Sequence, residues 1–330
     1  MQLPAHGQFN PTSAYSVNNP ELFLIELINH CNIQCLTCAR NDSWGDDMAK
    51  GAMPINHFKK IFDEIKPFVK GIVLIGLGEL LLYKPLVEVV SYIASKREDI
   101  QLFLATNGTV PTTEKVLKEV CRLLPTSIMF SVDGVGTTFD LVRKKASYRE
   151  FVAIIKSVIE NVQAIKFSFN MVVFDKNYHD MLNVLNLAKE LRITEVHFNS
   201  LNLAALPSTS LSVYDFYKTD KFQQQLYEAK RLASNLNISL TTFDFSESRG
   251  FKKCMYPWED FYITWDGFMA QCCAQPFPKL QNFGNVLDNG VMAAVNSPAF
   301  FEIREMWQAN KTPWMCQRCH KVKLPVIETE

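Results

Sequence analysis

The sequence has no long hydrophobic run and no excess of charge of either sign. None of its apolar stretches approaches the roughly eighteen residues that a membrane span needs. Residues 1–20 are polar and rich in turn formers, without the apolar core of a secretion signal. Lysine plus arginine equals aspartate plus glutamate at 34 each, which gives no strongly basic surface for nucleic acid. These absences predict a cytoplasmic protein that binds neither membranes nor nucleic acids.

Cysteine, in contrast, is abundant, with nine in 330 residues. An odd number of cysteines without an export signal argues against a disulfide framework. Eight of the nine fall into two groups near the ends of the chain, and such clustering favours metal ligation over scattered structural thiols. The ninth, Cys121, lies in an amphipathic helical pattern and is predicted to be a packing residue.

Short apolar runs alternate with amphipathic helical stretches through the first three quarters of the chain. This βα alternation predicts a parallel sheet covered by helices. Six repeats fall short of the eight in a closed barrel. The predicted strands span residues 22–28, 71–76, 102–105, 128–134, 166–174, 195–199 and 238–243.

Polar residues and glycines stand at or just beyond the ends of several predicted strands. In parallel α/β folds the functional site lies at the carboxyl ends of the strands. These positions are therefore predicted to converge on one rim. They are Gly78, Glu79, Asn107, Ser131, Asp133 and Asn170.

The first cysteine group consists of Cys31, Cys35 and Cys38, on the loop that leaves the first predicted strand. A C-x3-C-x2-C triplet suits three corners of a [4Fe–4S] cluster and leaves one iron without a protein ligand. A zinc site or a redox dithiol is the alternative. Zinc needs a fourth ligand, and His30 lies too close in sequence to Cys31 to serve comfortably.

This triplet resembles the signature of the radical S-adenosylmethionine (radical SAM) superfamily, and the resemblance covers most of the chain. It implies a partial (β/α)6 barrel, an α/β fold similar to a TIM barrel. It also implies that the open iron binds SAM, whose reductive cleavage gives a 5′-deoxyadenosyl radical that removes a hydrogen atom from the substrate. An external electron donor such as flavodoxin or ferredoxin is implied as a partner. Thr37 departs from the family, which often has an aromatic residue there.

Two further stretches resemble motifs of that family. The run Leu77-Gly78-Glu79-Leu80 resembles its second-strand Gly-Gly-Glu-Pro motif, which implies that Gly78 and Glu79 meet the methionine ammonium of SAM. Leu77 and Leu80 depart from the motif.

The stretch from Ser131 to Arg143 resembles the family's fourth-strand region. This implies that Ser131 meets the ribose or carboxylate of SAM and that Arg143 pairs with the carboxylate. Asp133, Asn107 and Asn170 are expected to contribute to the same cofactor site.

The second cysteine group resembles the C-terminal SPASM/twitch extension of radical SAM enzymes, and five cysteines suit its single-cluster form. The resemblance implies an auxiliary [4Fe–4S] cluster held by Cys254, Cys272, Cys316 and Cys319. A structural zinc is the alternative. We expect an N-terminal extension over residues 1–20, a core barrel over 21–245 and a small auxiliary-cluster domain over 246–330, with the boundary in the polar stretch 246–250.

Cys273 is the fifth cysteine of this group. The sequence Asp266-Gly267 between alternating apolar runs predicts a hairpin. Its alternation predicts that Cys272 and Cys273 point to opposite sides of the strand. Cys273 is then a free thiol that can return a hydrogen atom to a substrate radical, as in some radical SAM epimerases, with Asp260 to assist. Alternatively, Cys273 packs as a small hydrophobe or exchanges roles with Cys272.

The sequence therefore predicts a radical SAM enzyme that epimerises a peptide residue or a sugar carbon. A dehydrogenase or a peptide crosslinking enzyme, with the auxiliary cluster as electron acceptor, remains the alternative. A competing class is a metal-binding scaffold without catalysis. A radical SAM methyltransferase is disfavoured because no cobalamin-binding domain is recognisable.

Overall fold

The computed structural model describes residues 16–243 and 253–323. The expected domain boundary at 246–250, and most of the expected N-terminal extension, lie outside these residues. No helix within the described ranges has both the length and the apolar character that crossing a bilayer requires.

The described residues form one curved, open sheet of nine strands, in the order β11-β10-β1-β3-β4-β5-β7-β8-β9. Every neighbouring pair is parallel except β10 and β11. The strands are β1 (Leu22–Ile25), β3 (Gly71–Leu74), β4 (Gln101–Thr106), β5 (Thr126–Ser131), β7 (Lys166–Val173), β8 (Glu195–Ser200), β9 (Ser239–Thr242), β10 (Asp260–Ile263) and β11 (Met269–Ala270). The partial α/β barrel expected from the sequence is confirmed.

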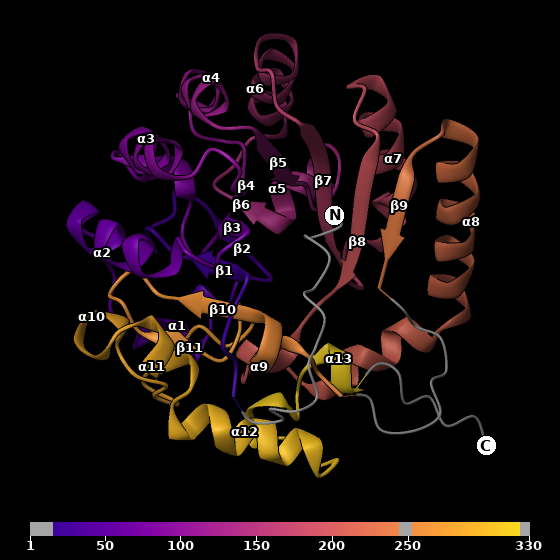
Figure 1. Cartoon of the computed structure of the whole chain (residues 1–330). Coiled ribbons are helices and arrows are strands. Elements are labelled where there is room, and N and C mark those ends of the chain that lie inside the picture. The colour runs from indigo at the N-terminus through magenta and orange to yellow at the C-terminus, as the bar shows by residue number, and fades with distance from the viewer. Residues whose placement is uncertain (1–15, 244–252, 324–330) are drawn as a thin grey trace.

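Helices cover the convex face of this sheet (Figure 1). They are α2 (Ile55–Ile65), α3 (Leu86–Lys96), α4 (Thr113–Leu123), α6 (Tyr148–Asn161), α7 (Met181–Glu190) and α8 (Asp220–Leu236). Helix α6 illustrates why: it buries Phe151, Ile155 and Val158, which recur on one helical face. Its N-terminus is capped by Ser147, whose side chain accepts a hydrogen bond from the backbone N–H of Glu150.

The concave face carries a separate set of side chains, because successive residues of a strand point to opposite faces. Leu22, Val73 and Phe103 form a small buried cluster there. Toward the carboxyl ends of the strands this face becomes polar, with Ser131 and Asn170 beside each other in register. The interior of the barrel is thus apolar toward the amino ends of the strands and polar at the rim formed by their carboxyl ends.

Strand β10 belongs to the barrel's own sheet. It pairs in parallel with β1, with Phe261 opposite Phe23, and β11 continues the sheet as the second arm of a hairpin. The sequence analysis assigned this hairpin to the small C-terminal domain. That domain therefore shares the barrel's hydrogen-bonded sheet.

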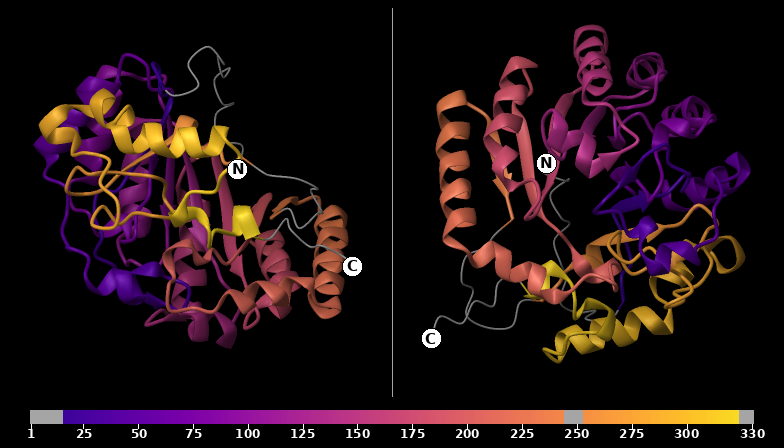
Figure 2. Two further views of the ribbon diagram at one scale, coloured as in Figure 1. Left: turned by 90° about the horizontal axis from the view of Figure 1, so that it is seen from below. Right: turned by 180° about the vertical axis from the view of Figure 1, so that it is seen from behind.

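The C-terminal segment crosses the opening between the two edges of the sheet (Figures 1 and 2). His320, at the start of α13 (His320–Lys323), lies 2.7 Å through Nδ1 from the hydroxyl oxygen of Ser200 at the end of β8. Tyr214 donates its hydroxyl to the backbone oxygen of Arg318. The remaining α-helices of the described residues are α1 (Ser43–Asp46), α5 (Thr137–Val142), α9 (Tyr256–Glu259), α10 (Val286–Asn289), α11 (Val291–Val295) and α12 (Pro298–Gln308).

Arg304 holds α12 against this part of the fold. Its side chain is fully buried and donates to the backbone oxygens of Pro257 and Val295, both at 2.8 Å. Burial lowers the pKa of Arg304 to about 10, so the guanidinium still carries its charge at neutral pH.

We expect Arg304→Ala to lower the free energy of unfolding by about 3 kcal/mol, because two buried carbonyl groups lose a charged donor. Urea denaturation under anaerobic conditions measures this. Glu305→Ala, on an exposed position of the same helix, is the matched control and should change stability by less than about 0.5 kcal/mol. Equal stability of the two variants would contradict the role given to Arg304.

Candidate functional site

A cavity of about 310 Å³ lies at the carboxyl ends of strands β1, β3, β4, β5 and β7. Its lining includes all three cysteines of the first group and every residue that the sequence analysis assigned to the cofactor. These residues are Cys31, Cys35, Cys38, Gly78, Glu79, Asn107, Ser131, Asp133, Arg143 and Asn170. Thr37 lies in the same wall.

The cysteine loop is held in place by a short two-stranded sheet between β2 (Gln34–Cys35) and β6 (Arg143–Lys144). In this sheet Cys35 pairs with Arg143. Burial raises the pKa of the Cys35 thiol to about 12, and the nearby Arg143 charge only partly offsets this. A positively charged metal group is what favours the thiolate form at such a position.

The Gly78–Glu79 loop is packed directly on the cysteine loop. A Cβ atom on Gly78 would lie 2.3 Å from the backbone oxygen of Ile28, so only glycine fits. The backbone N–H of Glu79 donates to the oxygen of His30 at 2.8 Å. Gly78 is thus required by the approach of two loops, whether or not its backbone also meets a cofactor.

The carboxylate of Glu79 is buried and accepts three hydrogen bonds from the protein. Its donors are the hydroxyl of Thr106 at 2.5 Å, the backbone N–H of Asn107 at 2.7 Å and that of Leu81 at 3.0 Å. Burial raises the pKa of Glu79, and these hydrogen bonds oppose that shift. An ionised carboxylate has about four acceptor positions, so one is left for a ligand ammonium.

Asp133 and Arg143 form a buried ion pair of 2.6 Å. The other oxygen of Asp133 accepts from the backbone N–H of Val172, so Asp133 orients Arg143 against β7. The Nε atom of Arg143 is buried without a hydrogen-bond partner in the described residues, while Arg143 lines the cavity. An orphaned guanidinium donor beside the cysteines suits a ligand carboxylate, which fits SAM.

Asparagine side chains fix two further parts of this cavity. Asn107 lies with its Nδ2 3.7 Å from the sulfur of Cys31 and also donates to Asn32 at 2.9 Å. Asn170 accepts a hydrogen bond of 2.6 Å from Asn199 on the neighbouring strand. Both amides are therefore oriented by the protein.

The second cysteine group surrounds another cavity, of about 200 Å³. Cys254, Cys272, Cys273, Cys316 and Cys319 all line it. The prediction that strand alternation separates Cys272 from Cys273 is wrong, because β11 ends at Ala270 and both cysteines lie in the turn beyond it. Cys273 is exposed, whereas Cys316 is buried.

Side-chain amides contact these thiols. Gln271 places Nε2 2.8 Å from the sulfur of Cys316, and Asn202 places Nδ2 3.7 Å from that of Cys319. Within residues 16–243 and 253–323, no three His, Cys, Asp or Glu side chains converge to hold a single metal ion.

Asp260 stands apart from the first cavity. It is buried at the beginning of β10, opposite Leu22 at the beginning of β1, and lines neither of the two cysteine cavities. Burial raises the pKa of Cys273 to about 11 and the charge of Asp260 adds to this shift, so the two side chains are neighbours. Cys273 and Asp260 thus accompany the second cysteine group.

Glu26 is a site residue that the sequence analysis missed. It is buried at the end of β1 and accepts from the backbone N–H of Leu77 at 2.7 Å, the hydroxyl of Tyr262 at 2.9 Å and the backbone N–H of Trp265 at 3.5 Å. Burial raises the pKa of Glu26 to about 7, although these hydrogen bonds oppose the shift. A carboxylate inside an otherwise apolar strand was the signal that could have found it.

Comparisons with known proteins agree with this geometry. Residues 25–188 match the radical SAM superfamily, and residues 254–320 match an iron–sulfur cluster-binding domain, SPASM. No curated protein matches the sequence.

Solved structures of similar fold include Streptococcus suis SuiB bound to the precursor peptide SuiA. It is 13% identical, with a TM-score of 0.69, over 94% of this chain and 72% of that chain. Native anSMEcpe with bound AdoMet is 17% identical, with a TM-score of 0.66, over 93% and 92% of the two chains. BtrN with AdoMet and 2-DOIA is 14% identical, with a TM-score of 0.54, over 95% and 98%. At these identities the likeness establishes the fold alone.

The raised pKa of Glu26 predicts a pH-dependent stability. Between its unfolded value of 4.5 and its folded value of about 7, the folded protein binds more protons than the unfolded chain. Stability should therefore be lost as the pH rises through this window. Relative to Glu26→Gln, the wild type should lose about 3 kcal/mol between pH 4.5 and 7.5.

Urea denaturation of the metal-free protein across this range measures the effect. Glu305→Gln, at an exposed position of α12, is the control and should follow the wild type. Parallel stability curves for wild type and Glu26→Gln would show that folding does not raise the pKa of Glu26.

Proposed function

The chain belongs to the radical SAM superfamily and carries a SPASM domain, and we propose that it modifies a peptide substrate by hydrogen-atom abstraction followed by hydrogen return from Cys273. The observation that carries the proposal is the first cavity, which gathers three cysteines, Gly78–Glu79 and the orphaned donor of Arg143 at one rim. The peptide is favoured because SuiB, of similar fold, binds a precursor peptide.

Cys31, Cys35 and Cys38 would hold three corners of a [4Fe–4S] cluster and leave the fourth for SAM. Cluster and SAM, when bound, supply the oxidant that removes one hydrogen atom from a substrate C–H bond. Arg143 would bind the carboxylate of SAM through its Nε, and Glu79 would accept from the ammonium. Ser131, Asn107 and Asn170 complete the lining.

Cys254, Cys272, Cys316 and Cys319 would hold the auxiliary cluster, with Gln271 and Asn202 as amide neighbours of the thiolates. This leaves Cys273 outside the four proposed cluster ligands, at an exposed residue position although its thiol is desolvated by its surroundings. A thiol that binds no iron keeps its hydrogen atom and can donate it to a substrate radical.

In the proposed epimerisation, the S–H bond of Cys273 breaks and a C–H bond forms on the opposite face of the substrate carbon. The sulfur radical that remains takes one electron from an external donor, such as flavodoxin or ferredoxin, and one proton from water. Asp260, as a charged neighbour of Cys273, would influence this proton transfer.

A dehydrogenase or crosslinking enzyme is the second candidate. It is favoured by one observation: Cys273 lines the same cavity as the four other thiols, so it can serve the auxiliary cluster instead of the substrate. The substrate radical would then pass one electron to that cluster, and no hydrogen return is needed.

Iron content tests the assignment of the two cysteine groups. After anaerobic reconstitution the wild type should hold about eight irons, and Cys31/Cys35/Cys38→Ala about four. The triple variant should also lose formation of 5′-deoxyadenosine from SAM under dithionite. Cys121→Ala, outside both groups, is the control and should keep the full iron content. Four irons in the wild type would remove the auxiliary cluster from the proposal.

Deuterium incorporation tests the role of Cys273. With a peptide that stimulates 5′-deoxyadenosine formation, wild type in heavy water should give product with one deuterium at the attacked carbon. Cys273→Ala should keep SAM cleavage and lose at least about 100-fold of this incorporation, since that is the scale of losing an essential hydrogen donor. Product formation by Cys273→Ala at the wild-type rate would instead support the dehydrogenase or crosslinking reaction.

A further inference from the structure

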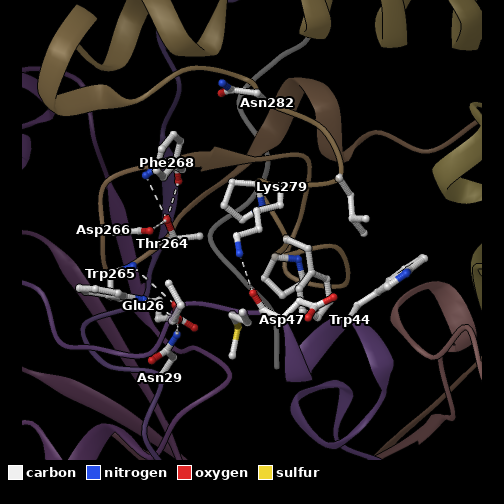
Figure 3. A pocket seen from close by; sticks show the side chains of 16 residues that line it. Glu26, Asn29, Trp44, Asp47, Thr264, Trp265, Asp266, Phe268, Lys279 and Asn282 are labelled. Atoms are coloured by element: carbon white, nitrogen blue, oxygen red, sulfur yellow. Dashed lines mark hydrogen bonds between the residues drawn. The ribbon is translucent and has the colours of Figure 1, made fainter.

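A third cavity, of about 380 Å³, lies beyond the carboxyl ends of β1 and β10 (Figure 3). Its size is in the range of ligand-binding pockets, about 300–1,000 Å³. Neither cysteine group lines it, and no residue with a role in the proposed function borders it. Of the residues described with the candidate site, Glu26 and Trp265 line it. Its aromatic lining consists of Trp44, Trp265, Phe268 and Phe277.

Two loops close this cavity, and each follows one of the cysteine groups. Trp44 lies in α1, shortly after Cys38, and Phe277 lies shortly after Cys273. The two rings meet edge to face with centroids 5.9 Å apart. Lys279 also joins the loops, because its ammonium donates to the backbone oxygen of Asp47 at 2.8 Å (Figure 3).

The cavity also adjoins the first cysteine cavity through a shared wall. Glu26 lines the third cavity, while Gly76 and Leu77 line the first. The Glu26 carboxylate accepts from the N–H of Leu77, and a Cβ on Gly76 would lie 2.5 Å from the Glu26 side chain. A ligand in the third cavity would therefore lie directly beside the expected SAM site.

The charges around the cavity favour a cation. Asp47 and Asp266 contribute carboxylates, Glu26 adds a third when it is ionised, and Lys279 is the cation among the lining residues. Asp266 accepts from the hydroxyl of Thr264 at 2.6 Å, which leaves its other oxygen for a ligand. Aromatic faces beside carboxylates attract a positive charge carried on an apolar body.

We propose that this cavity binds a large apolar or aromatic side chain of the peptide substrate together with an adjacent basic residue. The inference rests on the proposed function, since it names the part of a peptide that the enzyme recognises. A ligand cation here would also favour the ionised form of Glu26, whose pKa burial has raised.

Calorimetric titration of the reconstituted holoenzyme tests the proposal without requiring turnover. The probes are three blocked peptides, acetyl-Gly-Phe-Arg-Gly-amide and the same peptide with Gln or with Glu in place of Arg. Affinity should fall in the order Arg, Gln, Glu, with at least about tenfold between the first and the last, because the lining carries an excess of negative charge.

Two substitutions locate the binding. Ala49→Trp fills the cavity from an exposed position of its wall and should weaken binding of the Arg peptide by at least about tenfold. Ala309→Trp, exposed at the end of α12, is the matched control and should bind as the wild type does. Asp266→Asn keeps the oxygen that accepts from Thr264 and should reduce the preference for Arg over Glu. Trp44→Ala, which removes one wall, replaces Ala49→Trp if the latter does not fold.

Equal affinities for the three peptides, no binding of any at millimolar concentration, or unchanged binding by both Ala49→Trp and Trp44→Ala would overturn the inference. SAM cleavage under dithionite without peptide is measured separately on the same preparations. Loss of that activity in the wild type would refute the proposed function, whereas normal cleavage with failed peptide recognition would refute only this inference.

Discussion

One buried carboxylate joins the three strand ends on which the candidate site depends. Glu79 follows β3, its backbone N–H is bound to the cysteine loop after β1, and its side chain accepts from Thr106 and Asn107 at the end of β4. A buried carboxylate without these donors would be strongly destabilised. The cysteine loop and the neighbouring strands are therefore held in one arrangement, and Asn107 is carried to the sulfur of Cys31.

The open sheet is the second constraint. A parallel sheet that does not close leaves two edges, and unpaired edges need to be covered. Here the β10–β11 hairpin extends one edge beyond β1, and the C-terminal segment crosses toward the end of β8, where His320 meets Ser200. The second cysteine group is thus built where the fold needs a bridge, so a bound cluster would stabilise the barrel as well as take part in chemistry.

Much of this fold was predictable, because strand and helix patterns are local. Continuous apolar runs separated by amphipathic stretches gave the βα repeats, and loop cysteines at fixed spacing gave the first group. The pairing of β10 with β1 was not predictable, since the paired residues Leu22 and Asp260 lie 238 positions apart and no local pattern records such a partner. The hairpin's second strand was also shorter than its sequence suggested, which moved Cys272 and Cys273 into a turn.

By itself the sequence indicated an iron–sulfur site in the first cysteine loop, because cysteine spacing within one loop fixes the ligand geometry over a few residues, and its resemblance to the radical SAM superfamily indicated the class of chemistry. It also determined that polar residues follow the strands. Only the tertiary structure decided what those residues contact: that Asp133 orients Arg143, that Glu79 is largely satisfied by protein donors, and that Glu26 links two loops. Such contacts join residues distant in sequence, and burial gives them their strength only once the chain is folded.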